Sequence, residues 1–259
     1  MKKTILAGLI AASAAFDANA LTSGDLAFTS FNADEDGWSL VTFTNIAANT
    51  TLFFSDNEWN GSAIGGGGAF NSGESFHKWV SGAGIINAGT VIRFSATDKT
   101  TLSASAGTLQ RETVAGSANY GTANSNETIY VYQGSASTPT SFITAITNGT
   151  FTADGSIGGT GLIEGSTALR LNTLAPGATP DYAEYTGIRS GLTTYAGYKP
   201  LVANMANWNV DTTNGTYTTT VPNTTAFTIS PVPEPESWAM LLVGVGLVGM
   251  AARRKFVAG

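Results

Sequence analysis

Short runs of alternating apolar and small polar residues recur along most of this chain, and they constrain its fold more than any other feature. In the run 25–31, Leu26 and Phe28 stand two positions apart, so both side chains lie on one face of an extended strand. Asn, Asp or Gly stands one or two positions after most of the runs, as expected for short strands joined by turns. Strands are predicted at residues 25–31, 38–44, 51–54, 90–94, 128–132, 167–171, 181–185 and 226–229.

Two segments do not follow this pattern cleanly. Residues 141–146 fit either a strand or one helical turn, and residues 201–208 are the best candidate for a helix, though a short one. We find no internal repeat and therefore expect an all-β fold, a single β-sandwich domain over 21–230 with decorated loops. Two subdomains meeting near residues 100–120 are the alternative, because 100–107 is rich in Ser, Thr and Ala.

The composition agrees with this fold and excludes several functions. Only 12% of the residues are charged, and small polar residues are abundant, which favours strands and turns over helices. Between residues 21 and 235, seven Lys and Arg stand against sixteen Asp and Glu, so nucleic-acid binding has no electrostatic basis. The chain has no cysteine and one histidine, His77, which excludes disulfides, thiolate sites and a histidine-based zinc site.

The N-terminal segment 1–20 has the three parts of a secretory signal peptide. Lys2 and Lys3 form a positive region, residues 5–16 form a short apolar region, and Ala18 and Ala20 form an A-x-A cleavage site. We expect signal peptidase to cut after Ala20 and the protein to be exported across an inner membrane.

The C-terminal segment 231–259 begins with a proline-rich linker, and three parts of it can be distinguished. Pro233, Glu234 and Pro235 come first, a charge-free apolar run over 238–252 follows, and the basic residues come last: Arg253, Arg254 and Lys255. Fifteen residues of helix at about 1.5 Å each measure roughly 22 Å, short of the ~30 Å hydrocarbon core. We expect a short, marginal transmembrane helix over 237–252, with the basic residues on the cytoplasmic side.

These three parts, in this order, resemble the PEP-CTERM sorting signal of exported bacterial proteins. The resemblance implies recognition and cleavage by an exosortase near Pro233, Glu234 and Pro235, followed by release or attachment at the cell surface. It also implies an exopolysaccharide-rich surface or biofilm. The alternative is an ordinary tail anchor that is never cut.

The body carries weaker resemblances. Segments 24–29, 32–34, 55–59, 127–134 and 204–208 are similar to a domain found in bacterial surface and secreted proteins. The pattern over 38–94 is similar to lamin-tail-like domains of the Ig fold, which implies a β-sandwich. Neither resemblance implies a catalytic activity.

A calcium loop is one candidate site in the body. Asn32, Asp34 and Asp36 place oxygen ligands at alternate positions, and Gly37 stands sixth, as in calcium-binding loops. Position twelve is Phe43, where such a loop has a bidentate glutamate. The alternative is a solvated acidic turn between two strands. We therefore assign no cofactor and keep calcium as an open hypothesis.

A second acidic loop follows the third predicted strand. Asp56 and Glu58 could chelate an ion or act as an acid/base pair on a sugar, whereas the alternative is that Asp56 caps a turn. Trp59 could stack on a sugar ring if exposed, and otherwise belongs to the core. His77 is expected at the surface of a strand or turn, and no G-x-S-x-G motif accompanies it.

The sequence therefore predicts a non-catalytic, exported surface or matrix protein, processed by an exosortase after transient anchoring in the inner membrane. A carbohydrate-binding or adhesive module, either with or without calcium, is the first alternative. A hydrolase using Asp56 or Glu58 is the second.

Overall fold

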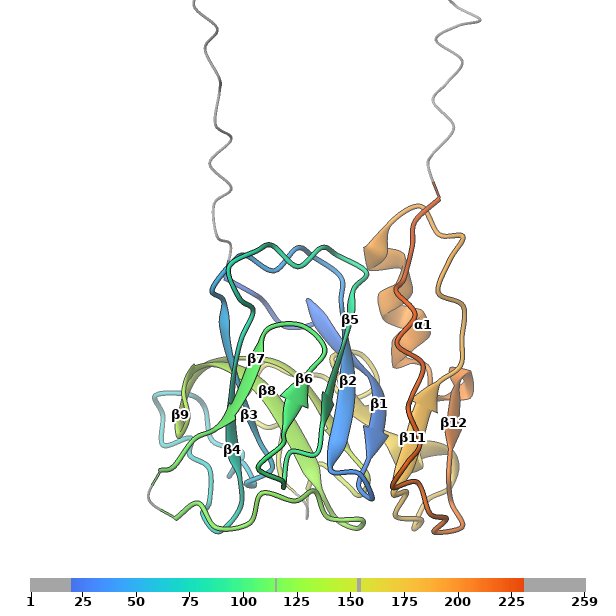
Figure 1. Ribbon diagram of the computed structural model, residues 1–259. Coiled ribbons are helices and arrows are strands. Elements are labelled where there is room, and N and C mark those ends of the chain that lie inside the picture. Colours follow the sequence, from blue (N-terminus) through green and yellow to red (C-terminus); the bar gives the residue numbers. More distant parts are fainter. Residues whose placement is uncertain (1–19, 115, 153–154, 231–259) are drawn as a thin grey trace, which may run out of the picture.

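A computed structural model describes residues 20–114, 116–152 and 155–230 of the chain (Figure 1). The described residues form mostly strands in two sheets, with little helix. The predicted signal peptide up to Asn19 and the predicted transmembrane helix over 237–252 lie outside these ranges. Within them, no helix has the length and apolar character needed to cross a membrane.

Each sheet contains six strands. In the first sheet the order is β12 (Trp208–Val210), β11 (Tyr182–Tyr185), β1 (Leu26–Asn32), β2 (Gly37–Thr42), β5 (Val91–Ser95) and β6 (Ser103–Ala104). In the second it is β10 (Ala168–Arg170), β9 (Thr138–Thr147), β8 (Thr128–Ser135), β3 (Thr51–Ser55), β4 (Phe76–Val80) and β7 (Thr108–Arg111). Neighbouring strands are antiparallel except β9 and β10, which are parallel.

The helical segments are short and follow β10 and β11. They are the 3-10 helices η1 (Leu171–Leu174), η2 (Tyr195–Tyr198) and η3 (Met205–Asn207), and the α-helix α1 (Lys199–Ala203). Helix α1 packs against β1 of the first sheet. It ends at Ala203, and the next residue, Asn204, accepts a side-chain hydrogen bond from the backbone N–H of Ala206 and so caps η3.

The main core lies between the two sheets, which makes them the layers of a sandwich. Alternate residues of β1, β2 and β5 meet alternate residues of β3, β4 and β8 in one apolar cluster. The ring of Phe54 lies 4.8 Å from that of Phe94 and 5.3 Å from that of Trp38. Removing one such ring costs about 3–5 kcal/mol, because the cavity cannot fully close.

A second core covers the outer face of the second sheet. Its strand residues include Tyr130, Tyr132 and Phe142, and its cover comes from the connection 56–75 and the described parts of the connection 148–167. A Cβ on Gly68 would lie 2.3 Å from the Trp59 ring, so the glycine allows this cover to close on the tryptophan. Both faces of the second sheet are therefore buried.

Most predicted strands are confirmed, and the differences are instructive. The ambiguous segment 141–146 belongs to β9. The predicted helix over 201–208 is shorter, because Trp208 already begins β12. The prediction of a strand at 226–229 is wrong: this segment runs extended but makes only a single parallel bridge, between Leu192 and Ile229. Strands β4, β6, β7 and β12 were not predicted.

Candidate functional site

The three side chains of the predicted calcium loop bind two separate segments. Asn32 is buried in β1, where its side-chain amide donates to the carbonyl oxygens of Tyr217 and Thr220. A carboxylate oxygen of Asp34 accepts a hydrogen bond from the backbone N–H of Tyr217. Asp36 instead accepts one from the backbone N–H of Thr122, at 2.7 Å. The loop is thus tied to two separate segments.

Asp36 also lies next to another acidic residue, Asp98. Burial, together with a hydrogen bond to Asp98, raises the pKa of Asp36 to about 7. Across residues 20–114, 116–152 and 155–230, no group of three or more Asp, Glu or His side chains is arranged to hold a metal ion. Asn32 and Asp34 bind the segment 217–220 and Asp36 binds Thr122, and calcium at these three residues stays a prediction.

A buried polar cluster lies between the sheets where β3 ends and β4 begins. Asp56 accepts hydrogen bonds from the backbone N–H of Ser75 at 2.6 Å and from its hydroxyl at 2.8 Å. The Ser75 hydroxyl lies 3.3 Å from Nδ1 of His77, whose Nε2 lies 3.2 Å from the carbonyl oxygen of Thr97. The strand pair β3–β4 holds these residues together by matching Ser55 to Phe76.

His77 is therefore buried, not at the surface as the sequence suggested, and its side chain is 1% exposed. The signal was present in the alternation of β4, because His77 and Trp79 stand two positions apart and face the main core together. Burial lowers the pKa of His77 to about 4, so the imidazole is neutral at pH 7.

The carboxyl groups near this cluster hold their protons unusually tightly. Burial raises the pKa of Asp56 to about 7 and that of Glu74 to about 7. Burial and the charge of Asp56 raise the pKa of Glu127 to about 9. Close carboxyl groups in a low dielectric cannot all ionise together, so protons remain bound among them at pH 7.

This cluster contains the groups of a Ser-His-Asp triad without its arrangement. In a triad the histidine accepts the serine proton and the aspartate holds the histidine. Here the Ser75 hydroxyl donates to Asp56, and the far nitrogen of His77 faces a backbone carbonyl. The space among these side chains does not admit a water molecule. The cluster closes one end of the main core.

Glu58 and Trp59 lie on the other side of the second sheet. The Glu58 carboxylate interacts with Glu74, and its backbone N–H is bound by the side chain of Asn71. Trp59 is 2% exposed, and its Nε1 donates to the carbonyl oxygens of Ser62 and Gly158. Trp59 thus offers no face to a sugar ring, and the core alternative describes its position.

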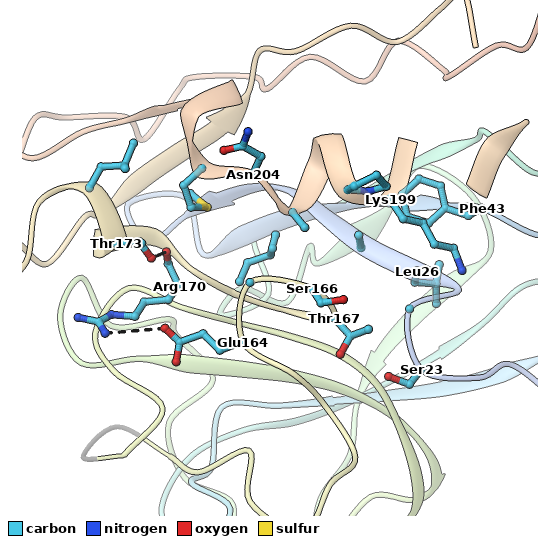
Figure 2. A pocket seen from close by; sticks show the side chains of 18 residues that line it. Ser23, Leu26, Phe43, Glu164, Ser166, Thr167, Arg170, Thr173, Lys199 and Asn204 are labelled. Atoms are coloured by element: carbon cyan, nitrogen blue, oxygen red, sulfur yellow. Dashed lines mark hydrogen bonds and ion pairs between the residues drawn. The ribbon is translucent and has the colours of Figure 1, made fainter. Parts of the chain in front are cut away.

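A groove of about 740 Å³ lies beside α1 (Figure 2). It runs between α1 and the segment 164–174, and the start of β1 contributes to its floor. Its apolar floor and walls include Leu26, Phe43, Leu169 and Met205. Polar side chains stand along it, namely Ser23, Ser166, Thr167, Thr173 and Asn204.

Each end of the groove carries an ion pair. Arg170 and Glu164 lie 3.8 Å apart at one end (Figure 2). Lys199 lies 3.5 Å from Asp25 near the other end and 5.8 Å from the centre of the Phe43 ring. Sequence reasoning missed this groove because its walls come from three distant segments, and no local pattern links them.

The predicted sorting and cleavage residues lie outside the described ranges, with one exception. They are Ala18, Pro233, Glu234, Pro235, Arg253, Arg254 and Lys255. Ala20 is described and is exposed.

Comparison with known proteins identifies the C-terminal segment. Residues 231–255 match the family model described as the PEP-CTERM protein-sorting motif. No curated protein and no solved structure matches the chain. The resemblance inferred from the tail is therefore confirmed: a PEP-CTERM motif directly follows Ser230, the last described residue of a β-rich body.

Proposed function

We propose that this chain, in which a PEP-CTERM motif follows a β-rich body, is an exported, non-catalytic surface protein processed by an exosortase. The motif at 231–255 carries the proposal. Pro233, Glu234 and Pro235 are the residues read by the processing enzyme, and Arg253, Arg254 and Lys255 hold the tail tip on the cytoplasmic side. The inner membrane holds the protein only until the cut.

The attachment of the tail to the body supports this assignment. The ring of Phe227 packs 5.1 Å from that of Tyr198 and 5.7 Å from that of Tyr185. The Arg189 guanidinium lies 4.9 Å from the Phe227 ring and donates to the carbonyl oxygen of Thr225. The motif therefore begins only a few residues after a segment that is firmly bound, so a cut there releases a folded body.

The closed polar cluster supports a non-catalytic role. Ser75, His77 and Asp56 are the residues of nucleophilic or acid/base type in it, and all three are buried. Catalysis needs a substrate atom within hydrogen-bond reach of such groups. Their hydrogen bonds to one another and to Thr97 instead serve the stability of the body.

The C-terminal mass of the mature protein from its native host tests the proposal. We expect an end near Pro233 to Glu236, and we expect Pro235→Ala to leave the precursor uncut. Pro176→Ala is the matched control, because Pro176 is exposed on the body far from the motif in the sequence. An intact Gly259 in the mature protein would refute processing.

Carbohydrate binding is the second candidate, and the groove beside α1 favours it. Its hydroxyl and amide side chains can hydrogen-bond sugar hydroxyls, while its apolar floor suits the C–H face of a ring. An exopolysaccharide at the cell surface would be the ligand.

A glycan panel with the processed protein tests this candidate. Ser166→Trp should fill the groove and abolish binding, whereas Ser137→Trp, on the exposed β8–β9 turn, should leave binding unchanged. Equal loss in both variants, or no binding to any glycan, would remove the candidate.

A further inference from the structure

The strand registers define two ends of the sandwich. Leu26 pairs with Thr42 and Thr51 pairs with Val80, so the connections 43–50 and 81–90 lie at one end. Asn32 pairs with Gly37 and Ser55 pairs with Phe76, so the β1–β2 and β3–β4 connections lie at the other.

The first end has no charged residue in its connections. We call it the neutral end and define it by residues 43–50, 81–90, 105–107, 134–137 and 190–198, which contain no Asp, Glu, Lys or Arg. The nearest charges neutralise each other, because Asp25 and Lys199 form an ion pair. Arg189, which precedes the last segment, is buried.

The opposite end holds most of the acidic residues of the body. We call it the acidic end. Its acidic residues are Asp34, Glu35, Asp36, Asp56, Glu58, Glu74, Asp98, Glu112, Glu127, Asp181 and Asp211. Glu35 and Asp98 are paired with Arg93 and Lys99, and burial keeps some of the other carboxyl groups protonated at pH 7. Asp211, with a pKa lowered to about 2 by hydrogen bonds that outweigh burial, is ionised.

The described chain leaves the body at the neutral end (Figure 1). The backbone N–H of Phe227 donates to the carbonyl oxygen of Gly89, and that of Ser230 donates to the carbonyl oxygen of Leu192. Pro233 is three residues beyond Ser230, which is at most about 10 Å of extended chain. The apolar run begins at Trp238, eight residues beyond Ser230, so the tether starts within about 30 Å of the neutral end.

We propose that the neutral end is the surface that the tethered precursor turns toward a phospholipid bilayer. This inference rests on the proposed function, because the tether is the apolar run of the sorting motif. Loops without charges approach a bilayer without losing ionic hydration. Two exposed apolar side chains at this end, Ile85 at 46% and Ile229 at 42%, can contact the headgroup region.

The distance between the ends decides the orientation. β3 has five residues and spans the sandwich, so at about 3.3 Å per residue the acidic end lies roughly 17 Å farther from the membrane. That exceeds the Debye length of about 8 Å at physiological ionic strength, so its repulsion from anionic lipids is screened. The reverse orientation would press the acidic end against the same lipids.

Labels at single cysteines test this orientation directly, because the chain has no cysteine of its own. The full-length precursor is reconstituted into vesicles of phosphatidylethanolamine and phosphatidylglycerol that contain a headgroup quencher. Labels on Ala83→Cys and Ala196→Cys report on the neutral end, and labels on Thr100→Cys and Thr219→Cys report on the acidic end. All four positions are exposed.

We expect several-fold stronger quenching at Ala83→Cys and Ala196→Cys than at the two acidic-end positions. Equal quenching at both ends, in protein that floats with the vesicles, would overturn the orientation and leave the proposed function intact. Protein that does not float would overturn the membrane tether itself, and the orientation with it.

A charged residue introduced at either end gives a second test, in which the rate of precursor processing is measured in the native host. Ala83→Glu should slow conversion of the precursor to the mature form about five-fold, because one carboxylate near an anionic surface is repelled to that extent. Thr100→Glu, the matched control at the acidic end, should leave the rate unchanged. Equal rates in the two variants would contradict the proposal.

Discussion

The two ends of the sandwich are closed by different chemistry. At the acidic end, hydrogen bonds among Asp56, Ser75 and His77 fill the gap between the sheets. At the neutral end, aromatic rings do so, and Phe227 packs there against Phe43 and Tyr198. A polar closure depends on protonation, whereas an aromatic closure does not.

The two ends therefore affect different properties of the protein. The acidic end makes the stability of the body sensitive to pH, while the neutral end holds the segment that leads to the sorting motif. Four substitutions or conditions can test the contrast, and we take them from the largest expected effect to the smallest.

Phe227→Ala should have the largest effect. Phe227 is 1% exposed, and truncating a buried phenylalanine costs about 3–5 kcal/mol. We expect a lower Tm and early proteolysis within residues 221–230. Ile229→Ala is the control, because Ile229 is exposed and its loss should change the Tm little. Unchanged proteolysis in Phe227→Ala would show that other contacts hold the segment.

The free energy of unfolding should fall between about pH 5 and about pH 8. Asp56 and Glu74 have folded pKa values of about 7, above those of unfolded chains, so the native state binds more protons in this interval. This contribution to stability is fully present below the unfolded pKa values and is lost as the pH rises through the folded ones, at about 1.4 kcal/mol per pKa unit at most for each group. Glu127, with a pKa of about 9, extends the loss upward.

Urea unfolding across this pH range measures the effect, and Glu127→Gln should flatten the upper part of the profile. Glutamine has nearly the same shape but does not titrate, and it can still accept the hydrogen bond from the backbone of Ala123. A profile that rises with pH would contradict the assignment of protonated carboxyl groups to the acidic end.

His77 should act in the opposite direction and more weakly. Its folded pKa of about 4 is below the usual 6.5, so unfolded chains gain a proton first as the pH falls. Its contribution is present above pH 6.5 and is lost toward pH 4, at about 1.4 kcal/mol per pKa unit at most. His77→Gln should lower stability at neutral pH yet remove this acid-side loss. If the free energy of unfolding of His77→Gln, measured in urea, still falls toward pH 4 as in the unsubstituted protein, the acid-side loss comes from other groups.

Arg93→Gln should have the smallest effect. Arg93 pairs with Glu35 at the acidic end, and both side chains are partly exposed. Pairs of this kind contribute about 0–1 kcal/mol, so the Tm should change by a degree or two at most. The pair is screened by salt, and a loss that persists in about 1 M salt would indicate packing of the arginine stem instead.

Local patterns predicted much of the fold. Alternation placed β1, β2, β3, β5 and β8 nearly at their observed bounds. It failed for 226–229, because an apolar alternation does not state whether a partner strand exists. It also missed β4: His77 and Trp79 alternate toward the main core, but Phe76 on the opposite face is buried as well, so the strand has no consistently polar face.

The sites depended on contacts that no local pattern contains. Asn32 and Asp36 are four residues apart, yet one binds the segment 217–220 and the other binds Thr122. Trp59 is buried because the described parts of the connection 148–167 fold back over the second sheet. The groove beside α1 joins three segments in the same way.

The sequence by itself determined the sorting motif, the absence of cysteine chemistry and the charge-free connections, since none of these depends on which distant segments meet. Only the tertiary structure decided that His77 is neutral and enclosed, and that the uncharged connections gather at the end where the chain leaves the body. The reason is physical: a motif read by an enzyme is local, whereas burial, and the pKa shifts it causes, are set by which distant strands pair.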